Sequence, residues 1–375
     1  MTSTARISRD NAYLKRAFRA FSATLLGTSA LWAAQEDIRV HYGDSSGDRY
    51  GALVTGVGNV DLDTYQDYAI SSLGGFGKVQ VFDGRHGTLL YTLNGNEAGG
   101  EFGRSLCTLG DLNDDGRDEF AVTAWMEGQQ ASPDAGKVYI YSGDGSLLAG
   151  PGQFPELLMG SSAGDRFGSS IASFGDWNGD GSVEVAIGAI DADENGSSSG
   201  SVHIIEIGWD SSAEVLTVAP LATLYGEQPG DRFGSSLTTG NLVGGPRLEL
   251  AIGAPLSDGA PALANRGAVQ VWAMSPAGVL SLVETLQGAE SGDQFGHSVA
   301  ILSGWSAVNE RALAVGSVQA DENGSSSGSV SVFSLAGSGG SLLHEVHGLV
   351  AGDKLGAAIA NGGDVNQDGH EDLII

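Results

Sequence analysis

The sequence repeats one short glycine pattern six times, and this repetition constrains the fold more than any other feature. Each copy has two glycines eight residues apart, with an aromatic residue or Leu directly before the second glycine. The six pairs are Gly43/Gly51, Gly95/Gly103, Gly160/Gly168, Gly226/Gly234, Gly288/Gly296 and Gly348/Gly356. Successive second glycines are 52, 65, 66, 62 and 60 residues apart, so the pattern predicts one module of roughly sixty residues copied along the chain.

Each full module contains the same four apolar segments, and their alternation predicts β-strands. The third segment is the clearest, because it begins with Gly and then alternates, as in 77–82, 136–141 and 267–272. No segment after residue 36 has the 3.6-residue period of an amphipathic helix. Four antiparallel strands in a module of this length are typical of a propeller blade, so we predict an all-β fold, a β-propeller of four-stranded blades.

The copies predict five complete blades and part of a sixth. Residues 38–43 match a fourth strand that no earlier module precedes, and residues 372–375 stop within a second strand. We therefore expect the chain to be truncated at its C-terminal end, as a fragment of a longer polypeptide whose propeller has six or seven blades.

Charge and composition limit the kinds of partner that the chain can bind. The formal net charge is −28, from 18 Lys and Arg against 46 Asp and Glu, which argues against nucleic acid or an anionic membrane as a partner. No apolar run is long enough to insert into a bilayer. Cys107 is the only cysteine, so no intrachain disulfide can form.

The first 35 residues have the order of a targeting segment. Five basic residues, the last of them Arg19, precede the apolar run 21–34, which ends in small residues. A secretory signal has this order, although Leu31 and Trp32 lie where small residues are preferred at the cut. We expect residues 1–35 to direct secretion or surface display, with an organelle transit peptide as the alternative, and residues 36–375 to form the propeller.

Acidic loops between the first and second strands carry the strongest chemical signal. In three modules, oxygen-bearing side chains stand at loop positions 1, 3, 5 and 9, with glycine at position 6 and a main-chain carbonyl available at position 7. Ca²⁺ takes about six to eight oxygen ligands in such loops. The predicted ligands are Asp111, Asn113, Asp115, Arg117 and Glu119; Asp176, Asn178, Asp180, Ser182 and Glu184; and Asp364, Asn366, Asp368, His370 and Asp372.

The first module offers a weaker fourth site, because Thr64 stands where glycine is expected. Its ligands would be Asn59, Asp61, Asp63, Tyr65 and Asp67. The fourth module keeps Asn241 and Glu249 but has lost the inner oxygens, so we predict at most four Ca²⁺ ions with a structural role. The alternative is an Asx-rich turn that only closes a hairpin.

These motifs together resemble the FG-GAP repeat of integrin α-subunit propellers. The pattern stands at 164–168, 176–181 and 187–190, and the fourth module has the literal Gly253-Ala254-Pro255. The second module departs from it, with Gly100 in place of Asp. The resemblance implies seven blades in the parent propeller. It also implies a ligand surface on the face opposite the calcium loops, built from the second-to-third and fourth-to-first connections.

The sequence contains no catalytic constellation that fits this fold. Residues 196–200 match Gly-x-Ser-x-Gly, but they lie in a polar loop before a strand and recur at 324–328. We therefore predict a non-enzymatic, calcium-stabilised module, secreted or at the cell surface, that binds a protein or glycan ligand in adhesion. The alternative is the propeller part of a larger secreted enzyme of the hydrolase or lipase type.

Overall fold

The structure is a computed structural model that describes residues 39–129, 131–149, 158–244, 248–259, 263–275, 279–305, 311–335 and 339–375. Its contacts divide the chain into residues 1–42 and 43–375, and every strand of the described residues belongs to the second unit. The predicted targeting segment, residues 1–35, lies outside the described residues. All regular elements of the described residues are β-strands, as predicted, and none of these residues forms an apolar helix long enough to cross a bilayer.

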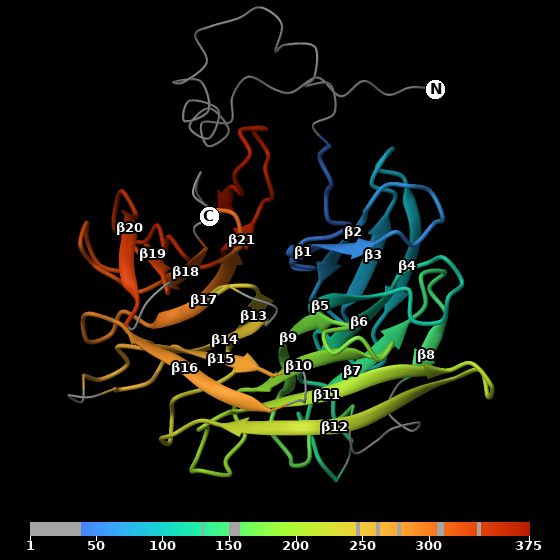
Figure 1. The fold of residues 1–375 in the computed structure, drawn as a ribbon, viewed down its shortest axis with the longest axis horizontal. Coiled ribbons are helices and arrows are strands. Elements are labelled where there is room, and N and C mark those ends of the chain that lie inside the picture. Colours follow the sequence, from blue (N-terminus) through green and yellow to red (C-terminus); the bar gives the residue numbers. More distant parts are fainter. Residues whose placement is uncertain are drawn as a thin grey trace, which may run out of the picture. The chain divides into compact units, whose positions relative to one another are not determined.

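Five antiparallel sheets of four strands follow one another along the chain, with the strands of each sheet in chain order (Figure 1). The first sheet contains β1 Tyr50–Gly58, β2 Asp67–Ser72, β3 Lys78–Phe82 and β4 Leu89–Asn94. The second contains β5 Phe102–Gly110, β6 Glu119–Ala124, β7 Lys137–Tyr141 and β8 Leu147–Ala149. The third contains β9 Phe167–Gly175, β10 Val183–Ala189, β11 Ser201–Asp210 and β12 Val215–Tyr225.

The last sheets have the same order. The fourth contains β13 Ser236–Gly240, β14 Glu249–Ala254, β15 Ala268–Met274 and β16 Leu280–Gln287. The fifth contains β17 Phe295–Leu302, β18 Ala312–Ser317, β19 Ser329–Ser334 and β20 Ser341–His347. A further pair, β21 Ala360–Asn361 and β22 Leu373–Ile374, forms the beginning of a sixth sheet, so the prediction of five complete blades and part of a sixth is confirmed.

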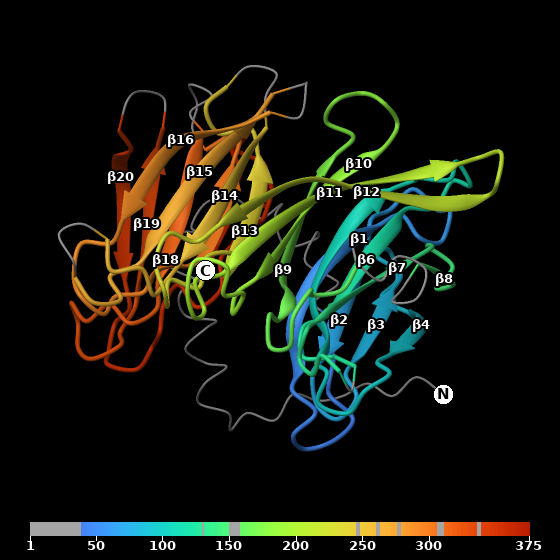
Figure 2. The ribbon, with the colours of Figure 1, turned by 90° about the horizontal axis from the view of Figure 1, so that it is seen from below.

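The first strand of each sheet contacts the first strand of the next, from β1 through β5, β9, β13 and β17 to β21. The first strands are therefore the inner strands of the array, and the fourth strands β4, β16 and β20 have at most one buried residue each. Figure 2 shows consecutive sheets stacked face to face. This is how blades pack in a propeller.

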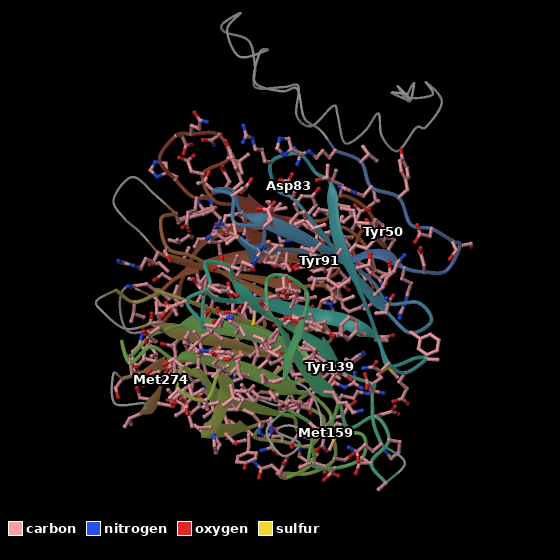
Figure 3. The ribbon with its side chains drawn as sticks, turned by 90° about the vertical axis from the view of Figure 1, so that its right-hand side faces the viewer. Tyr50, Asp83, Tyr91, Tyr139, Met159 and Met274 are labelled. Atoms are coloured by element: carbon pink, nitrogen blue, oxygen red, sulfur yellow. The ribbon has the colours of Figure 1, made fainter. Side chains whose placement is uncertain are left out.

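Apolar layers between neighbouring sheets form the core. One layer joins the first two sheets and includes Val79, Phe102 and Val122, with Tyr91 and Tyr139 (labelled in Figure 3) at its side. Similar layers follow between the second and third sheets and between the fourth and fifth. The second strands β6, β10, β14 and β18 are buried along their whole length, because both faces of their sheets are covered.

The glycine pairs lie where one blade connects to the next. A Cβ at Gly226 would stand 2.0 Å from the carbonyl oxygen of Ser199, so a larger residue does not fit. Gly234 has a φ of +90°, which favours glycine. Between them the N–H of Phe233 donates to the Ser199 oxygen at 3.0 Å, and the ring enters the core with 2% of its surface exposed. The pair therefore fastens the third strand of one blade to the first strand of the next.

One expected strand is absent. Residues 39–43 form no strand and appear in no β-ladder of the described residues. The prediction that residues 38–43 form a strand like the fourth strand of each module is therefore wrong for residues 39–43, the part that the structure describes. An extended segment becomes a strand only when a neighbouring edge supplies hydrogen bonds, and no described edge pairs with this one.

Candidate metal centres

The three predicted calcium loops share one backbone arrangement at the ends of the inner strands. In the second blade, the Asp111 carboxylate accepts hydrogen bonds from the N–H groups of Asp115 at 3.1 Å and Gly116 at 2.9 Å. Gly116 has a φ of +89°, which allows the chain to turn back around this carboxylate. The loops that begin at Asp176 and Asp364 have the same pair of bonds, with lengths of 2.9 to 3.1 Å.

The carboxylate at loop position 9 closes the loop from the other side. Glu119 accepts the N–H of Leu112 at 2.8 Å, and Glu184 accepts that of Trp177 at 3.1 Å. The same bond joins Asp372 to Val365, Asp67 to Val60 and Glu249 to Leu242. This acid therefore holds the loop through a hydrogen bond of its own, even in the fourth blade, which has lost the inner oxygens.

The second loop contains an observation that points to a cation. Glu119 is 0% exposed, and its Oε1 has no hydrogen-bond partner of normal geometry among the described residues. Burial raises the pKa of Glu119 to about 7, and the negative charges of Asp115 and Asp111 contribute a smaller part of this rise. By residue type, two aspartates and a buried glutamate suit a hard cation such as Ca²⁺. Among the described residues, however, only the first and third loops bring three carboxylate oxygens within 4.8 Å of one another.

The third loop gathers three carboxylates, one of which sequence reasoning missed. One oxygen each of Asp180, Glu184 and Glu206 lie within 4.8 Å of one another. Glu206 is on β11, directly opposite Glu184 on β10. Burial, and then the charges of Asp180 and Glu206, raises the pKa of Glu184. Glu206 is the sixth residue after Gly200, and counting the alternation of the third strand could have found it.

The first loop differs from the other three, as the sequence suggested. Asp61, Asp63 and Asp83 have carboxylate oxygens within 4.8 Å of one another. Asp83 is the sixth residue after Gly77, so it occupies the position that Glu206 has in the third blade. The Asn59 side chain donates to the carbonyl oxygen of Asp63 at 3.0 Å, and this side chain forms no bond like that of Asp111 to the N–H at position 6.

Loop position 8 links neighbouring blades. Asp118 accepts the N–H of Asn59 in the preceding loop at 2.7 Å. Glu371 likewise accepts the N–H of Ser303, in the loop of the preceding blade, at 2.6 Å. These bonds join the first loop to the second and the fifth to the sixth. The carbonyls of Tyr65, Arg117, Ser182 and His370 stay a prediction as position-7 ligands.

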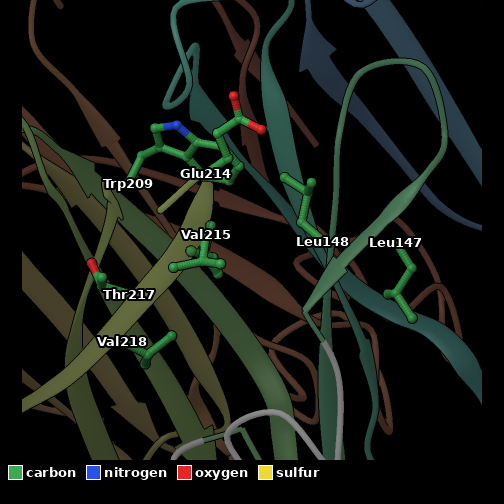
Figure 4. A pocket seen from close by; sticks show the side chains of 8 residues that line it. Leu147, Leu148, Trp209, Glu214, Val215, Thr217 and Val218 are labelled. Carbon is green, nitrogen blue, oxygen red and sulfur yellow. The ribbon is translucent and has the colours of Figure 1, made fainter. Parts of the chain in front are cut away.

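An apolar hollow lies at the outer side of the second and third blades, between β8 and the β11–β12 hairpin (Figure 4). Trp209 and Val215 form its floor with Leu148, and Glu214 is the one carboxylate among its described lining residues. This surface offers apolar contact and no acid–base pair.

Comparison with known proteins identifies the repeat. The family description that matches is the FG-GAP repeat, over residues 102–141, which contain the loop with the unpaired Glu119 oxygen. Residues 102–141 thus match the FG-GAP repeat, and longer stretches of the chain are similar to integrin alpha subunits. The aromatic-glycine pair of the FG-GAP repeat thus corresponds to the connection between blades, and its acidic loop to the hairpin between the first and second strands.

Similar proteins include integrin alpha-4 of Xenopus laevis, 32% identical over 200 residues, which are 51% of this chain and 18% of that protein. Integrin alpha-PS5 of Drosophila melanogaster is 32% identical over 197 residues, which are 51% of this chain and 19% of that protein. Integrin alpha-2 of Mus musculus is 31% identical over 170 residues, which are 41% of this chain and 14% of that protein. The chain spans less than a fifth of the length of these curated relatives.

Proposed function

We propose that the chain is a calcium-stabilised, extracellular β-propeller module that binds a protein partner, as adhesion proteins do. The observation that carries the proposal is the pair of N–H bonds to the position-1 carboxylate that the loops at 111–119, 176–184 and 364–372 share, together with the buried Oε1 of Glu119, which has no hydrogen-bond partner of normal geometry among the described residues.

The side chains at positions 1, 3, 5 and 9 of these loops would hold the cation, with the carbonyl at position 7. Bound there, Ca²⁺ would neutralise the clustered carboxylates and add its binding free energy to the folding free energy. The loops at 111–119, 176–184 and 364–372 supply three such sites, and the first loop a weaker fourth with Asp83 near it. Each ion would stiffen the hairpin between an inner strand and the second strand of its blade.

Placement outside the cell is consistent with loops of this kind. Extracellular calcium modules bind Ca²⁺ with dissociation constants of about 10⁻⁴–10⁻³ M, so they fill only where calcium is abundant. The proposed targeting role of residues 1–35 would bring the chain there.

The binding face lies away from the metal loops. The loop at 111–119 follows the C-terminal end of β5, whereas the connection from the preceding blade reaches its N-terminal end at Phe102. A nine-residue strand separates these ends by about 30 Å. A partner at the N-terminal ends can therefore bind without competing for the metal ligands, as the likeness to integrin alpha subunits implies.

An array of extracellular proteins and glycans, probed with the 375-residue chain, tests this function. We expect specific capture of a protein in millimolar Ca²⁺, lost in EDTA together with thermal stability. Capture should fall on substitution of Trp125, at the N-terminal ends, and persist on substitution of Tyr65, beside the first metal loop. Absence of captured proteins, capture of glycans alone, or equal capture in EDTA at unchanged stability would contradict it.

A further inference from the structure

Two positions in every module flank the aromatic-glycine pair at the N-terminal ends of the inner strands. One is the residue before the aromatic side chain or Leu, and the other is the residue after the glycine. The twelve inner-end positions are Arg49 and Ala52, Glu101 and Arg104, Arg166 and Ser169, Arg232 and Ser235, Gln294 and His297, and Lys354 and Ala357. All six residues before the aromatic or Leu have a left-handed backbone, with φ between 53° and 58°.

Left-handed backbone is uncommon for residues other than glycine and costs about 1–2 kcal/mol per residue. Repeating it in six modules, always before the same glycine, directs the same two side chains to the same end of each blade. The side chains at the twelve positions therefore lie on one surface of the protein.

These twelve positions are basic in an otherwise acidic protein. Residues 1–35 hold five of the 18 Lys and Arg and one of the 46 Asp and Glu, which leaves 13 basic and 45 acidic residues in the rest. The inner-end positions hold five of those 13 basic residues and one of those 45 acidic residues. Every module contributes one basic residue or histidine, and these six form the inner-end cluster: Arg49, Arg104, Arg166, Arg232, His297 and Lys354.

Contacts between blades bring the cluster together. Arg49 pairs with Glu101 of the next blade at 2.5 Å. Asp191 lies between Arg166 at 2.8 Å and Arg232 at 3.3 Å. The side chains of Arg49 and Arg232 are nevertheless 52% and 43% exposed, so part of each guanidinium faces solvent.

Trp125, from the loop after β6, supports the middle of the cluster. The guanidinium of Arg104 lies 4.4 Å from the centre of its ring, and that of Arg166 lies 5.1 Å away. The indole N–H donates to Glu101 at 2.7 Å, which fixes the ring. An arginine stacked on an aromatic ring keeps its N–H edge available for a carboxylate. Both arginines are thus held in place before a partner arrives.

Two cations of the cluster, Arg104 and Lys354, take part in no ion pair among the described residues, although the negative charge of Glu101 acts on Arg104 from nearby. Desolvation by neighbouring strands lowers the pKa of His297, and the positive charges of Arg104 and Lys354 lower it further. The His297 residue is nevertheless exposed. Charges from the second, fifth and sixth modules therefore converge here, and a partner's carboxylate can approach them without breaking an existing pair.

The acids around the cluster restrict what can bind. Five turn aspartates precede the left-handed residues, and backbone N–H groups of their own turns satisfy them: Asp48, Asp165, Asp231, Asp293 and Asp353. The outer loops at 192–200 and 320–328 each add Asp-Glu. Screening limits exposed charges to about 8–10 Å, so a compact acidic group reaches the cluster while a long polyanion also meets the acidic loops.

We propose that the inner-end cluster binds a short acidic segment, with adjacent Asp or Glu side chains, on the protein partner. This inference rests on the proposed function and specifies the chemistry of its partner. The carboxylates would bind the guanidinium of Arg104 and the ammonium group of Lys354, with Arg166 shared between the partner and Asp191, and the acidic outer loops would exclude extended anionic glycans.

Fluorescence anisotropy with a labelled tetra-aspartate peptide tests the proposal on the 375-residue chain in calcium buffer. We expect saturable binding that weakens with salt, and none of the tetra-asparagine peptide. Arg104→Gln combined with Arg166→Gln should weaken binding about tenfold, as expected for lost charge-assisted hydrogen bonds. Lys354→Gln, which disturbs no ion pair of the described residues, should weaken it in the same direction. Arg85→Gln, beside the first metal loop, is the matched control and should leave binding unchanged.

The proposal is overturned if the two peptides bind equally, if neither binds, or if Arg85→Gln acts as strongly as the double variant. It is also overturned if a heparin tetrasaccharide displaces the tetra-aspartate peptide with higher affinity. If a captured protein binds the N-terminal ends but ignores Arg104→Gln, Arg166→Gln and Lys354→Gln, the adhesion-module proposal stands and the acidic-segment inference fails. If the peptide binds but the chain captures no protein, the reverse holds.

Discussion

Replacing Asp176 and Asp180 together by asparagine should remove one Ca²⁺ ion and reverse its effect on stability. Asparagine keeps one of the two oxygens, which can still accept the N–H of Gly181 at position 176 and the N–H of Ser182 at position 180, while the bonds to the second oxygens are lost. The change therefore removes the charges and keeps part of the turn. In EDTA we expect the variant to be as stable as the natural chain or more stable, because Asp180 lies within 4.8 Å of Glu184 and Glu206 and their mutual repulsion is reduced.

In calcium buffer the variant should be less stable than the natural chain. With a dissociation constant of about 10⁻⁴–10⁻³ M and about 10 mM Ca²⁺, one filled site stabilises the folded state by about 1.4–2.7 kcal/mol. For a unit of residues 43–375, this corresponds to about 2–4 °C in Tm. The variant should lose this share of the calcium-induced rise in Tm.

Thermal unfolding followed by circular dichroism, in calcium and in EDTA, measures both effects. Asn241→Ala is the control, because Asn241 occupies position 1 of the fourth loop, where the inner acids are missing. It should keep the full calcium-induced rise. A double variant that kept the full rise, or that was destabilised equally in both buffers, would refute the assignment of this loop.

Three further changes test other parts of the account. Phe233→Ala should cost about 3–5 kcal/mol of unfolding free energy in chemical denaturation, with or without calcium, because a fully buried ring joins two blades; a cost below about 1 kcal/mol would contradict that role. Glu249→Ala should cost about 2 kcal/mol or more, since the N–H groups of Leu242 and Val243 lose their acceptor, while calorimetry should find the number of bound Ca²⁺ ions unchanged. Burial lowers the pKa of His203 below its ordinary value, so below about pH 6.5 the unfolded chain takes up a proton that the folded chain does not, and stability falls. His203→Gln should lose less Tm than the natural chain between neutral pH and pH about 5.5; an equal loss would contradict the burial.

The repeat allowed most of the fold to be predicted. A fixed glycine spacing and the alternation of 77–82 and 267–272 were enough to expect four-stranded blades, because each signal is local and recurs. The strand expected at 38–43 failed for a physical reason. A strand depends on a neighbouring edge as well as on its own sequence.

The loops were predictable only in part. Positions 1 to 9 are contiguous, so their oxygens could be read from spacing alone. Asp83 and Glu206 approach the loops from the third strand across the sheet, and their role depends on cross-strand register. The inner-end cluster was missed for a similar reason, since Arg104, Arg166 and Lys354 come from different modules.

The central claim is that the acidic loops are metal sites of a propeller, and anomalous diffraction from a crystal grown in CaCl₂ tests it most directly. We predict anomalous peaks inside the loops 111–119, 176–184 and 364–372, each ringed by carboxylate and carbonyl oxygens, with a weaker one at 59–67. Crystals of the folded chain with no peak in any of the three main loops would contradict the account.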